Sequence, residues 1–288
     1  MRQNTERHGP VRQPVVAGLF YPDNAQDIKK LLEKERWRER ERIEQHEVRG
    51  TIIGGVIPHA GLVYCARQAV HLFELLRHTR QSVDTVLIVH PNHSGYGPAM
   101  STDGHAAWET PMGRVEVDTQ MAEAMSLPLS AEAQSQEHSA EVILPYLHYF
   151  LSDPFKILSV NMQQQDVRHA EMLAEKAFAA TRQLGRKVLF LASSDFSHFM
   201  GPEESARLDD ELIGKILGKD IRSVYDVVTG LDISACGFGP IMALMAYSGR
   251  VDPAYRMGLL RRGHSGEVSP SPKVVNYVSM LSEALISD

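Results

Sequence analysis

The chain has 288 residues, of which 43% are hydrophobic and 23% are charged, proportions typical of one large globular domain or two small ones. Its formal net charge is −6, and no lysine- and arginine-rich patch is interleaved with aromatic residues, which argues against nucleic-acid binding. The first thirty residues lack the apolar core of a signal peptide, and no later stretch reaches the roughly 20 apolar residues needed to span a bilayer. We therefore expect a cytoplasmic protein that does not enter a membrane.

The N-terminal part of the chain predicts a tail followed by a charged helix. Residues 1–13 are polar and carry no recognisable chemistry, so we expect a flexible tail there. The segment 24–46 places Ile28, Leu31 and Leu32 at helical spacing and then continues with alternating charges. This pattern predicts a helix with a short apolar stripe, whose charged part faces solvent.

Four apolar runs follow along the chain, and each has the length and composition of a buried strand. They lie at 51–57, 85–89, 155–162 and 187–192. The residues after the first, third and fourth runs have the spacing of helices. Strands that alternate with helices predict an α/β protein with a largely parallel or mixed central sheet flanked by helices. Because no long linker divides the chain, we expect residues 14–288 to form a single domain.

Polar side chains follow three of these strands at the point where each strand ends. His59 follows the first strand, His93 the second, and Asp195 and His198 the fourth. In open α/β sheets, ligands bind beyond the carboxyl ends of the strands, so we expect these side chains to share one cleft. Cys236 precedes a helical pattern, where the helix dipole would favour the thiolate form of a metal ligand or redox group.

Other residues are candidates for supporting roles in the same cleft. His90 stands at the end of its strand, and we expect a buried partner of the ligands rather than a ligand. The stretch QEHSAEVILPYL at 136–147 is either a capped helix start or a second contribution to the cleft through Glu137 and His138. Cys65 falls inside a helical pattern and is expected to be a small core residue.

Two imidazoles and one anionic group at a cleft edge are typical of a metal centre with open coordination positions. With Asp195 as the third ligand, the set matches the two-histidine, one-carboxylate site of non-haem iron oxygenases. With Cys236 instead, the softer thiolate admits iron, zinc or copper(I). In both versions His198 remains free to donate or accept a proton, since an ordinary imidazole titrates near neutral pH.

Six motifs, in this order along the chain, resemble the MEMO family, whose prokaryotic members are called AmmeMemoRadiSam system protein B. They are PHAG at 58–61, PNHSG at 91–95, ETPMG at 109–113, EHSAEVILPY at 137–146, SSDFSHF at 193–199 and ACGFGP at 235–240. The opening GLFYP at 18–22 resembles the aromatic start of the family, and the match runs from about residue 14 to the end. The resemblance implies a fold related to the class III extradiol ring-cleavage dioxygenases, which use iron(II) on a two-histidine, one-carboxylate site.

The resemblance also implies roles for individual residues. The metal-binding histidines of the family match His59 and His93, and its metal-binding cysteine matches Cys236. Its nearby aspartate and histidine match Asp195 and His198, and the latter resembles the catalytic acid or base of the dioxygenase relatives. These correspondences favour the thiolate version of the site over the carboxylate version.

The sequence departs from the family pattern in two places. His90 stands in HPNH where many relatives have glycine, and the family does not settle the role of this extra imidazole. The arginine- and glutamate-rich segment 33–46 is longer than the family pattern. Neither departure touches the expected ligands.

Three classes of function remain open from the sequence. The first is a non-haem iron or copper redox protein or oxygenase, with Fe(II) as the first candidate cofactor and copper or zinc as alternatives. The second is a non-catalytic module that binds a peptide or small molecule in the same cleft, since eukaryotic members of the family are linked with phosphotyrosine signalling and cell motility. The third is a zinc-dependent hydrolase. The expected partners are a small-molecule substrate and, from the family's system name, a radical S-adenosylmethionine protein.

Overall fold

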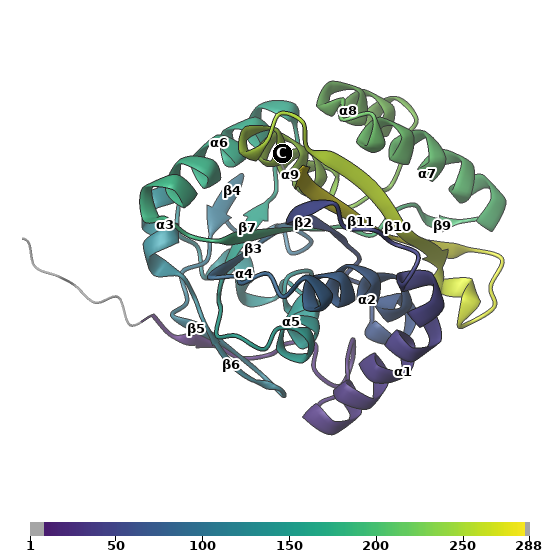
Figure 1. Ribbon diagram of the computed structural model, residues 1–288, viewed down its shortest axis with the longest axis horizontal. Helices are drawn as coiled ribbons and strands as arrows, with labels where there is room; N and C mark the ends of the chain where they lie inside the picture. Colours follow the sequence, from purple (N-terminus) through teal and green to yellow (C-terminus); the bar gives the residue numbers. More distant parts are fainter. Residues whose placement is uncertain (1–8, 286–288) are drawn as a thin grey trace, which may run out of the picture.

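The computed structural model describes residues 9–285 and is built around one mixed sheet of eight strands (Figure 1). The strand order is β10-β11-β2-β8-β3-β7-β4, and β9 pairs with β11 beside this path. The central strands β2, β8, β3 and β7 are parallel, whereas β10, β11 and β4 are antiparallel to their neighbours. The strands are β2 (Gly50–Ile57), β3 (Thr85–Pro91), β4 (Met100–Thr102), β7 (Lys156–Met162), β8 (Val188–Ser193), β9 (His198–Met200), β10 (Arg256–His264) and β11 (Val274–Leu285).

The predicted α/β class with a mixed central sheet is confirmed, and burial explains why these strands were recognisable. Every residue of β3 is buried, and β7 is buried after its first residue. Parallel strands that are covered on both faces read as continuous apolar runs. The strands β10 and β11 are less uniformly apolar, and the sequence did not predict them.

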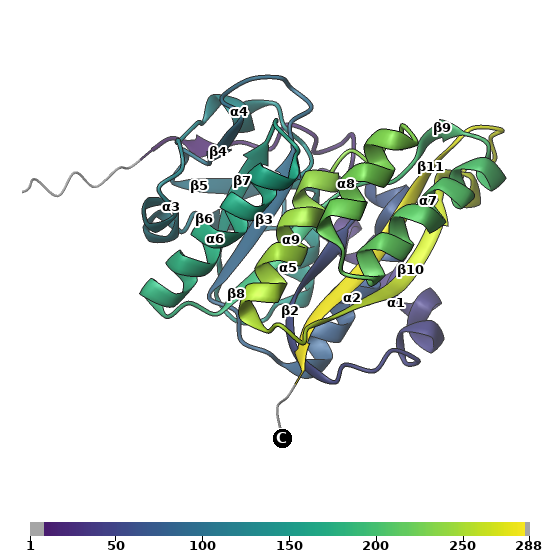
Figure 2. The same ribbon diagram turned by 90° about the horizontal axis from the view of Figure 1, so that it is seen from above.

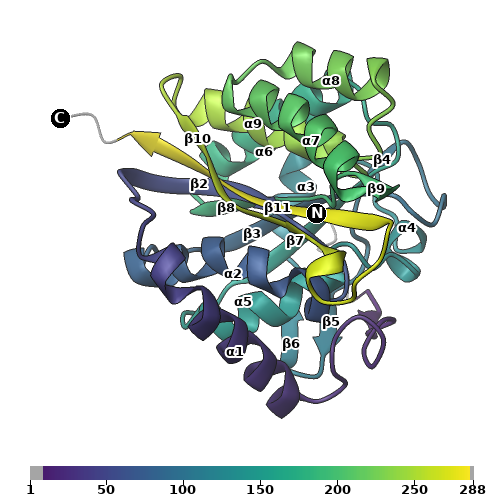
Figure 3. The same cartoon turned by 90° about the vertical axis from the view of Figure 1, so that its right-hand side faces the viewer.

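Helices cover both faces of the sheet (Figure 3). One face carries α1, α2 and α5, and the opposite face carries α6, α7, α8 and α9. The helices are α1 (Ala25–Ile43), α2 (Leu62–Thr79), α3 (Thr119–Met125), α4 (Glu132–Ser135), α5 (Leu144–Phe150), α6 (Val167–Leu184), α7 (Pro202–Leu217), α8 (Ile221–Gly230) and α9 (Phe238–Val251), with short 3-10 helices at Glu141–Ile143 and Ser265–Glu267. Among residues 9–285, none of these helices combines the length and the apolar sequence required to cross a membrane.

The charged helix α1 forms where the sequence predicts it, and most of its charged side chains are exposed as expected, but two glutamates are buried. Asn24 caps the helix by accepting a hydrogen bond from the Asp27 N–H at 2.9 Å. Glu35 and Glu39 are buried against α2 and β10. Glu39 accepts hydrogen bonds from Arg42 and Arg261, so ion pairs satisfy this buried carboxylate. Alternating charges on a helix do not reveal which of them another element will cover.

The domain also begins earlier than residue 14. Residues 1–8 of the predicted flexible tail lie outside the described part of the chain. Strand β1 (Val11–Arg12) pairs with β5 (Ala107–Thr110), which also pairs with β6 (Gly113–Glu116) in a small second sheet. Arg12 is buried and forms an ion pair with Glu141 at 2.6 Å, so this residue belongs to the folded domain.

Candidate metal centre

The strand order brings three sequence-predicted residues to one edge of the sheet. His59 lies two residues beyond β2, Asp195 two residues beyond β8 and His93 two residues beyond β3. In the sheet, β8 lies between β2 and β3, and all three strands are parallel. Their carboxyl ends therefore deliver these residues to neighbouring positions, as the rule for open α/β sheets predicts.

His59, His93 and Cys236 form a cluster with the donor atoms of a metal site. One candidate ligand atom from each of the three residues lies within 4.8 Å of those of the other two. His59 Nε2 lies 3.2 Å from Cys236 Sγ, and the rings of His59 and His93 meet edge to face with centroids 5.2 Å apart. Two imidazoles and a thiol would occupy three of the four positions of a tetrahedral site.

Cys236 reaches the strand ends because the chain passes very close to β8 at the start of α9. A Cβ atom on Gly237 would lie only 2.1 Å from the carbonyl oxygen of Ser193, so a side chain at this position would displace the backbone. Gln165 holds the same turn from the other side. Its amide donates to the Cys236 carbonyl at 2.8 Å and accepts from the Gly239 N–H at 2.7 Å. The position of the thiol is thus fixed by contacts on both sides.

Hydrogen bonds determine which nitrogen of His59 faces the cluster. The Ser193 hydroxyl donates to the carbonyl oxygen of Ser139 at 2.7 Å. Because its only proton is donated to Ser139, this hydroxyl accepts the Nδ1–H of His59, and the two heavy atoms lie 2.7 Å apart. The neutral ring therefore carries its proton on Nδ1 and presents the Nε2 lone pair toward Cys236.

His93 is oriented in the same way by a buried carboxylate. Its Nδ1 lies 2.9 Å from Glu137 Oε1, and its backbone N–H donates to Glu137 Oε2 at 2.6 Å. Glu137 Oε1 also accepts from the Ser139 N–H at 3.0 Å and from the Ser139 hydroxyl at 2.8 Å. Because a carboxylate accepts the Nδ1 proton, Nε2 of His93 is the free nitrogen.

His90 lies behind this arrangement, as expected for a supporting residue. It is fully buried, and its Nδ1 donates to the Pro91 carbonyl at 2.9 Å. Its Nε2 lies 2.8 Å from the Ser159 hydroxyl. Both ring nitrogens are therefore occupied, while the Ser139 hydroxyl connects His90 to the carboxylate of Glu137.

Burial lowers the pKa of His59, His90 and His138 and so favours their neutral forms. Desolvation, aided by the charges of neighbouring histidines, lowers the pKa of His59 well below its ordinary value. The pKa of His138 falls to about 4 because burial outweighs the nearby carboxylate of Glu137. Burial acts in the opposite sense on Glu137, but hydrogen bonds from His93 and the adjacent imidazoles hold its pKa well below the usual range. Neutral imidazoles beside an ionised carboxylate are the protonation states that cation binding requires.

Cys236 differs from the sequence prediction in one respect. Burial, followed by the charge of Asp195, raises the pKa of its thiol far above the ordinary value. The prediction that the helix dipole would favour a thiolate is therefore wrong for the metal-free protein, because desolvation is stronger than the dipole. A bound cation would favour deprotonation of this thiol.

Asp195 and His198 lie beside the three-residue cluster rather than within it. The Asp195 carboxylate is buried and accepts the His59 N–H at 2.9 Å, and burial raises its pKa to about 6. It joins neither group of candidate ligands within residues 9–285. His198 is partly exposed, and its Nδ1 donates to the Ser234 carbonyl at 2.8 Å, which leaves Nε2 directed away from that contact.

A second group of possible ligands consists of His93, Glu137 and His138. His138 stacks on His93 with ring centroids 4.7 Å apart, and the tilted ring of Phe20 also packs against it at a centroid distance of 4.8 Å. Glu137 is already the acceptor for His93 and Ser139, so its carboxylate serves those donors rather than an ion. The part of the sequence prediction that placed Glu137 and His138 in the cleft agrees with this geometry.

Sequence reasoning missed the small polar residues that orient the ligands. Ser139, Ser193 and Gln165 make the contacts described above, yet serines and glutamines at strand and helix ends are common throughout the chain. The only usable signal was that Ser139 and Ser193 lie inside two of the motifs that resemble the MEMO family. Ser193 contacts Ser139 and His59, which are 54 and 134 residues away in sequence, so spacing could not identify its role.

Comparisons with known proteins agree with this architecture. A family model described as "Memo-like protein" matches residues 12–281. A "MEMO1 family protein" from Archaeoglobus fulgidus is 38% identical over 276 residues, which covers 94% of this chain and 99% of that protein. A protein with the same description from Methanococcoides burtonii is 36% identical with the same coverage. The crystal structure of an uncharacterized protein from Escherichia coli K12 has a similar fold, with a TM-score of 0.57 and 11% identity over 80% of this chain and 99% of that one.

Proposed function

This chain belongs to the Memo-like protein family, and we propose that it binds one transition-metal ion through His59, His93 and Cys236. The observation that carries the proposal is the orientation of the two histidines. Ser193 fixes the proton on Nδ1 of His59 and Glu137 fixes it on Nδ1 of His93, so both Nε2 lone pairs are free. Metal-binding histidines are commonly held in this way by a second group on the other ring nitrogen.

The donor set indicates which metals fit. Two neutral imidazoles and one thiolate suit iron(II), copper or zinc. They argue against magnesium and calcium, which prefer oxygen ligands. We place Fe(II) first, since the chain has the fold expected from the dioxygenase-like resemblance and the three donors leave coordination positions open. A bound redox-active ion would supply electron transfer or activation of dioxygen at those positions, and the protein would then act as a non-haem redox protein or oxygenase on a small molecule.

The residues beside the cluster would handle protons. Asp195 has a pKa of about 6 and holds the His59 backbone N–H, so it controls the position of a ligand and can exchange a proton near neutral pH. His198 is anchored through Nδ1 to Ser234 and keeps Nε2 available at the partly exposed rim. We propose that His198 is the acid or base that contacts a bound substrate.

Elemental analysis of protein purified without oxygen or chelator tests the metal site. Wild type, His93→Ala and Cys236→Ser are compared, with Cys65→Ala as the control because Cys65 is buried in α2 with its thiol directed at the Ala60 carbonyl. We expect near-stoichiometric iron in wild type and in Cys65→Ala, and loss of most of it in the other two variants. Far-UV circular dichroism of all four proteins separates metal loss from unfolding.

The remaining outcomes decide between the alternatives. Zinc in place of iron, with activity retained under strict anaerobiosis, would favour the zinc-dependent hydrolase over the redox protein. Equal metal content in Cys236→Ser and wild type would overturn the assignment of the thiol. No bound metal in any folded sample after anaerobic reconstitution with Fe(II), Cu(I) and Zn(II) would refute the proposal and favour a cleft that binds a peptide or small molecule.

A further inference from the structure

A second site is suggested by a large cavity at the opposite edge of the sheet. Its volume is about 780 Å³, and Thr51 and Val188 place it at the amino ends of β2 and β8. Thr181 and Arg250 place it beside the carboxyl ends of α6 and α9. In Figure 2 this is the edge where the described chain ends, away from α4 and β9, which lie at the edge of the candidate metal centre.

The charge of this cavity is opposite to that of the protein. The chain has a net charge of −6, yet the residues that line the cavity include five cations and no carboxylate. The cations are Arg80, Arg182, Arg186, Lys187 and Arg250. Such a concentration of one sign in a concave site focuses the electrostatic field and attracts anions.

Neighbouring carboxylates neutralise only a small part of this charge. Arg186 lies 3.3 Å from Asp118, and Lys187 donates to the Ser82 hydroxyl at 2.8 Å. Within residues 9–285, no carboxylate oxygen lies within 4 Å of the guanidinium nitrogens of Arg80, Arg182 or Arg250. Their charges are therefore available to a ligand.

The helix dipoles do not account for these cations either. The carboxyl ends of α2, α6 and α9 all point toward this edge, and each carries an effective charge of about −0.5. Together they supply roughly −1.5, whereas Arg80, Arg182, Lys187 and Arg250 supply four positive charges that have no carboxylate partner among residues 9–285. The excess remains positive.

Part of the wall of the cavity is apolar. Ile53, Phe178, Val188 and Tyr247 contribute side chains to it, and the Tyr247 hydroxyl is already bonded to Thr181 at 3.1 Å. Tyr247 therefore offers its ring rather than a free hydroxyl. The volume lies within the roughly 300–1,000 Å³ typical of sites for small molecules.

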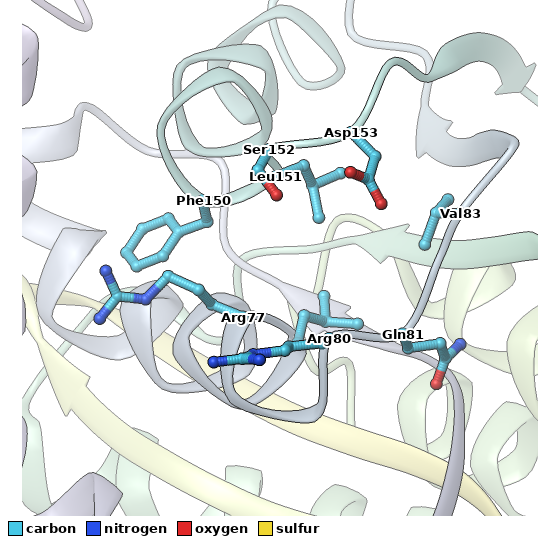
Figure 4. A pocket seen from close by; sticks show the side chains of 9 residues that line it. Arg77, Arg80, Gln81, Val83, Phe150, Leu151, Ser152 and Asp153 are labelled. Carbon is cyan, nitrogen blue, oxygen red and sulfur yellow. The ribbon is translucent and has the colours of Figure 1, made fainter.

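We propose that this cavity binds a small amphipathic anion, with its phosphate or carboxylate group on the arginines and its apolar body against Phe178 and Val188. Guanidinium groups suit such head groups because they donate two parallel hydrogen bonds. A smaller cavity of about 350 Å³ shares Arg80 and Gln81 with the larger one. Unlike the larger cavity, it is also lined by a carboxylate, so it is the less suitable site for an anion. Figure 4 shows Asp153 across that smaller cavity from Arg77 and Arg80, so its charge is partly balanced.

The aromatic sulfonate 8-anilino-1-naphthalenesulfonate has the required combination of groups and serves as the probe. Its fluorescence is titrated with the folded full-length protein, with Arg182→Glu and Arg250→Glu, and with Arg168→Glu as the matched control. Arg168 is exposed at the other end of the same helix as Arg182. We expect one saturable site in wild type and in the control, and at least about tenfold weaker binding in the two cavity variants. Thermal unfolding checks that each variant is folded. If Arg182→Glu does not fold, Arg182→Gln is used in its place.

Competition tests the apolar part of the proposal. Dodecyl phosphate below its micellar concentration should displace the probe at a far lower concentration than inorganic phosphate does. Equal probe affinity in all folded variants would overturn the site, since binding would then lie elsewhere. Equal competition by the two phosphates would overturn the amphipathic assignment, because the apolar wall would contribute nothing.

Discussion

The two edges of the central sheet carry opposite chemistry on the same strands. At the carboxyl ends of β2, β8 and β3, neutral imidazoles, a thiol and buried carboxylates surround the candidate metal centre. At the amino ends, a cavity is lined by arginines and a lysine. The first edge has donors for a cation, and the second has donors for an anion.

The edges also differ in how their charges are satisfied. Near the metal centre, buried polar groups are held by hydrogen bonds within the protein, and Glu137 alone accepts four of them. At the basic cavity, Arg182 and Arg250 are exposed and have no carboxylate partner within residues 9–285. Substitutions should therefore affect stability strongly at the first edge and weakly at the second, because only buried groups lose partners that water cannot replace.

The largest effect is expected from Arg12→Met. Arg12 pairs with Glu141 and donates to the Glu137 carbonyl at 2.7 Å, so it supports the turn that carries Glu137. Breaking a buried ion pair costs about 3–5 kcal/mol, and we expect about 3 because Glu141 keeps the hydroxyl of Tyr21 as a donor. Urea unfolding measures the change. The exposed pair of Arg114 with Glu116 is the control, and Arg114→Met should cost less than about 1 kcal/mol. A loss below about 1 kcal/mol for Arg12→Met would contradict the contrast between the edges.

Metal removal should give the next largest effect. An ion that binds only the folded protein stabilises it by about 2.7 kcal/mol when its free concentration is 100 times the dissociation constant. Chelated and Fe(II)-reconstituted proteins are compared by anaerobic thermal unfolding, and reconstitution should raise the Tm. His59→Ala should show no such shift, and a similar shift in that variant would place the ion elsewhere.

A smaller effect is expected from Glu137→Gln. The amide has one accepting oxygen and one donating nitrogen, so one of the two contacts with His93 is lost and the ring is less firmly oriented. Partners of this kind typically account for about 10- to 100-fold in metal affinity, which the dissociation constant for Fe(II) would reveal. Glu132→Gln removes the same charge from an exposed position nearby and should leave the affinity unchanged. Equal affinities for the two variants would mean that Glu137 does not orient the ligand.

The smallest effect on stability is expected at the basic cavity. Arg182→Gln removes an exposed charge without a carboxylate partner in the described part of the chain, so the free energy of unfolding should change by less than about 0.5 kcal/mol. Relief of repulsion between neighbouring arginines can even make the change stabilising. Urea unfolding again provides the measurement, and a loss above about 1 kcal/mol would show that Arg182 supports the fold.

The sequence predicted those parts of the molecule that depend on local pattern. The buried parallel strands and the helices α1, α2, α6 and α9 followed from hydrophobic runs and helical spacing. The rule that ligands bind beyond the carboxyl ends of parallel strands predicted that His59 and His93 share one edge, without any knowledge of the strand order. The antiparallel strand β11 was missed because Asn276, Ser279, Ser282 and Glu283 interrupt its apolar residues, so it gave no comparable run.

Amino-acid order by itself determined the fold class and the residue types at the strand ends, since apolar periodicity and strand direction are local properties. Only the tertiary structure decided that β8 lies between β2 and β3, that Glu137 orients His93 and that burial keeps the Cys236 thiol protonated without a cation. It also gathered Arg80, Arg182 and Arg250 from the carboxyl ends of three helices around one cavity. The physical reason is the same in each case: desolvation and hydrogen bonding depend on groups that lie far apart in the chain, and packing alone brings them into contact.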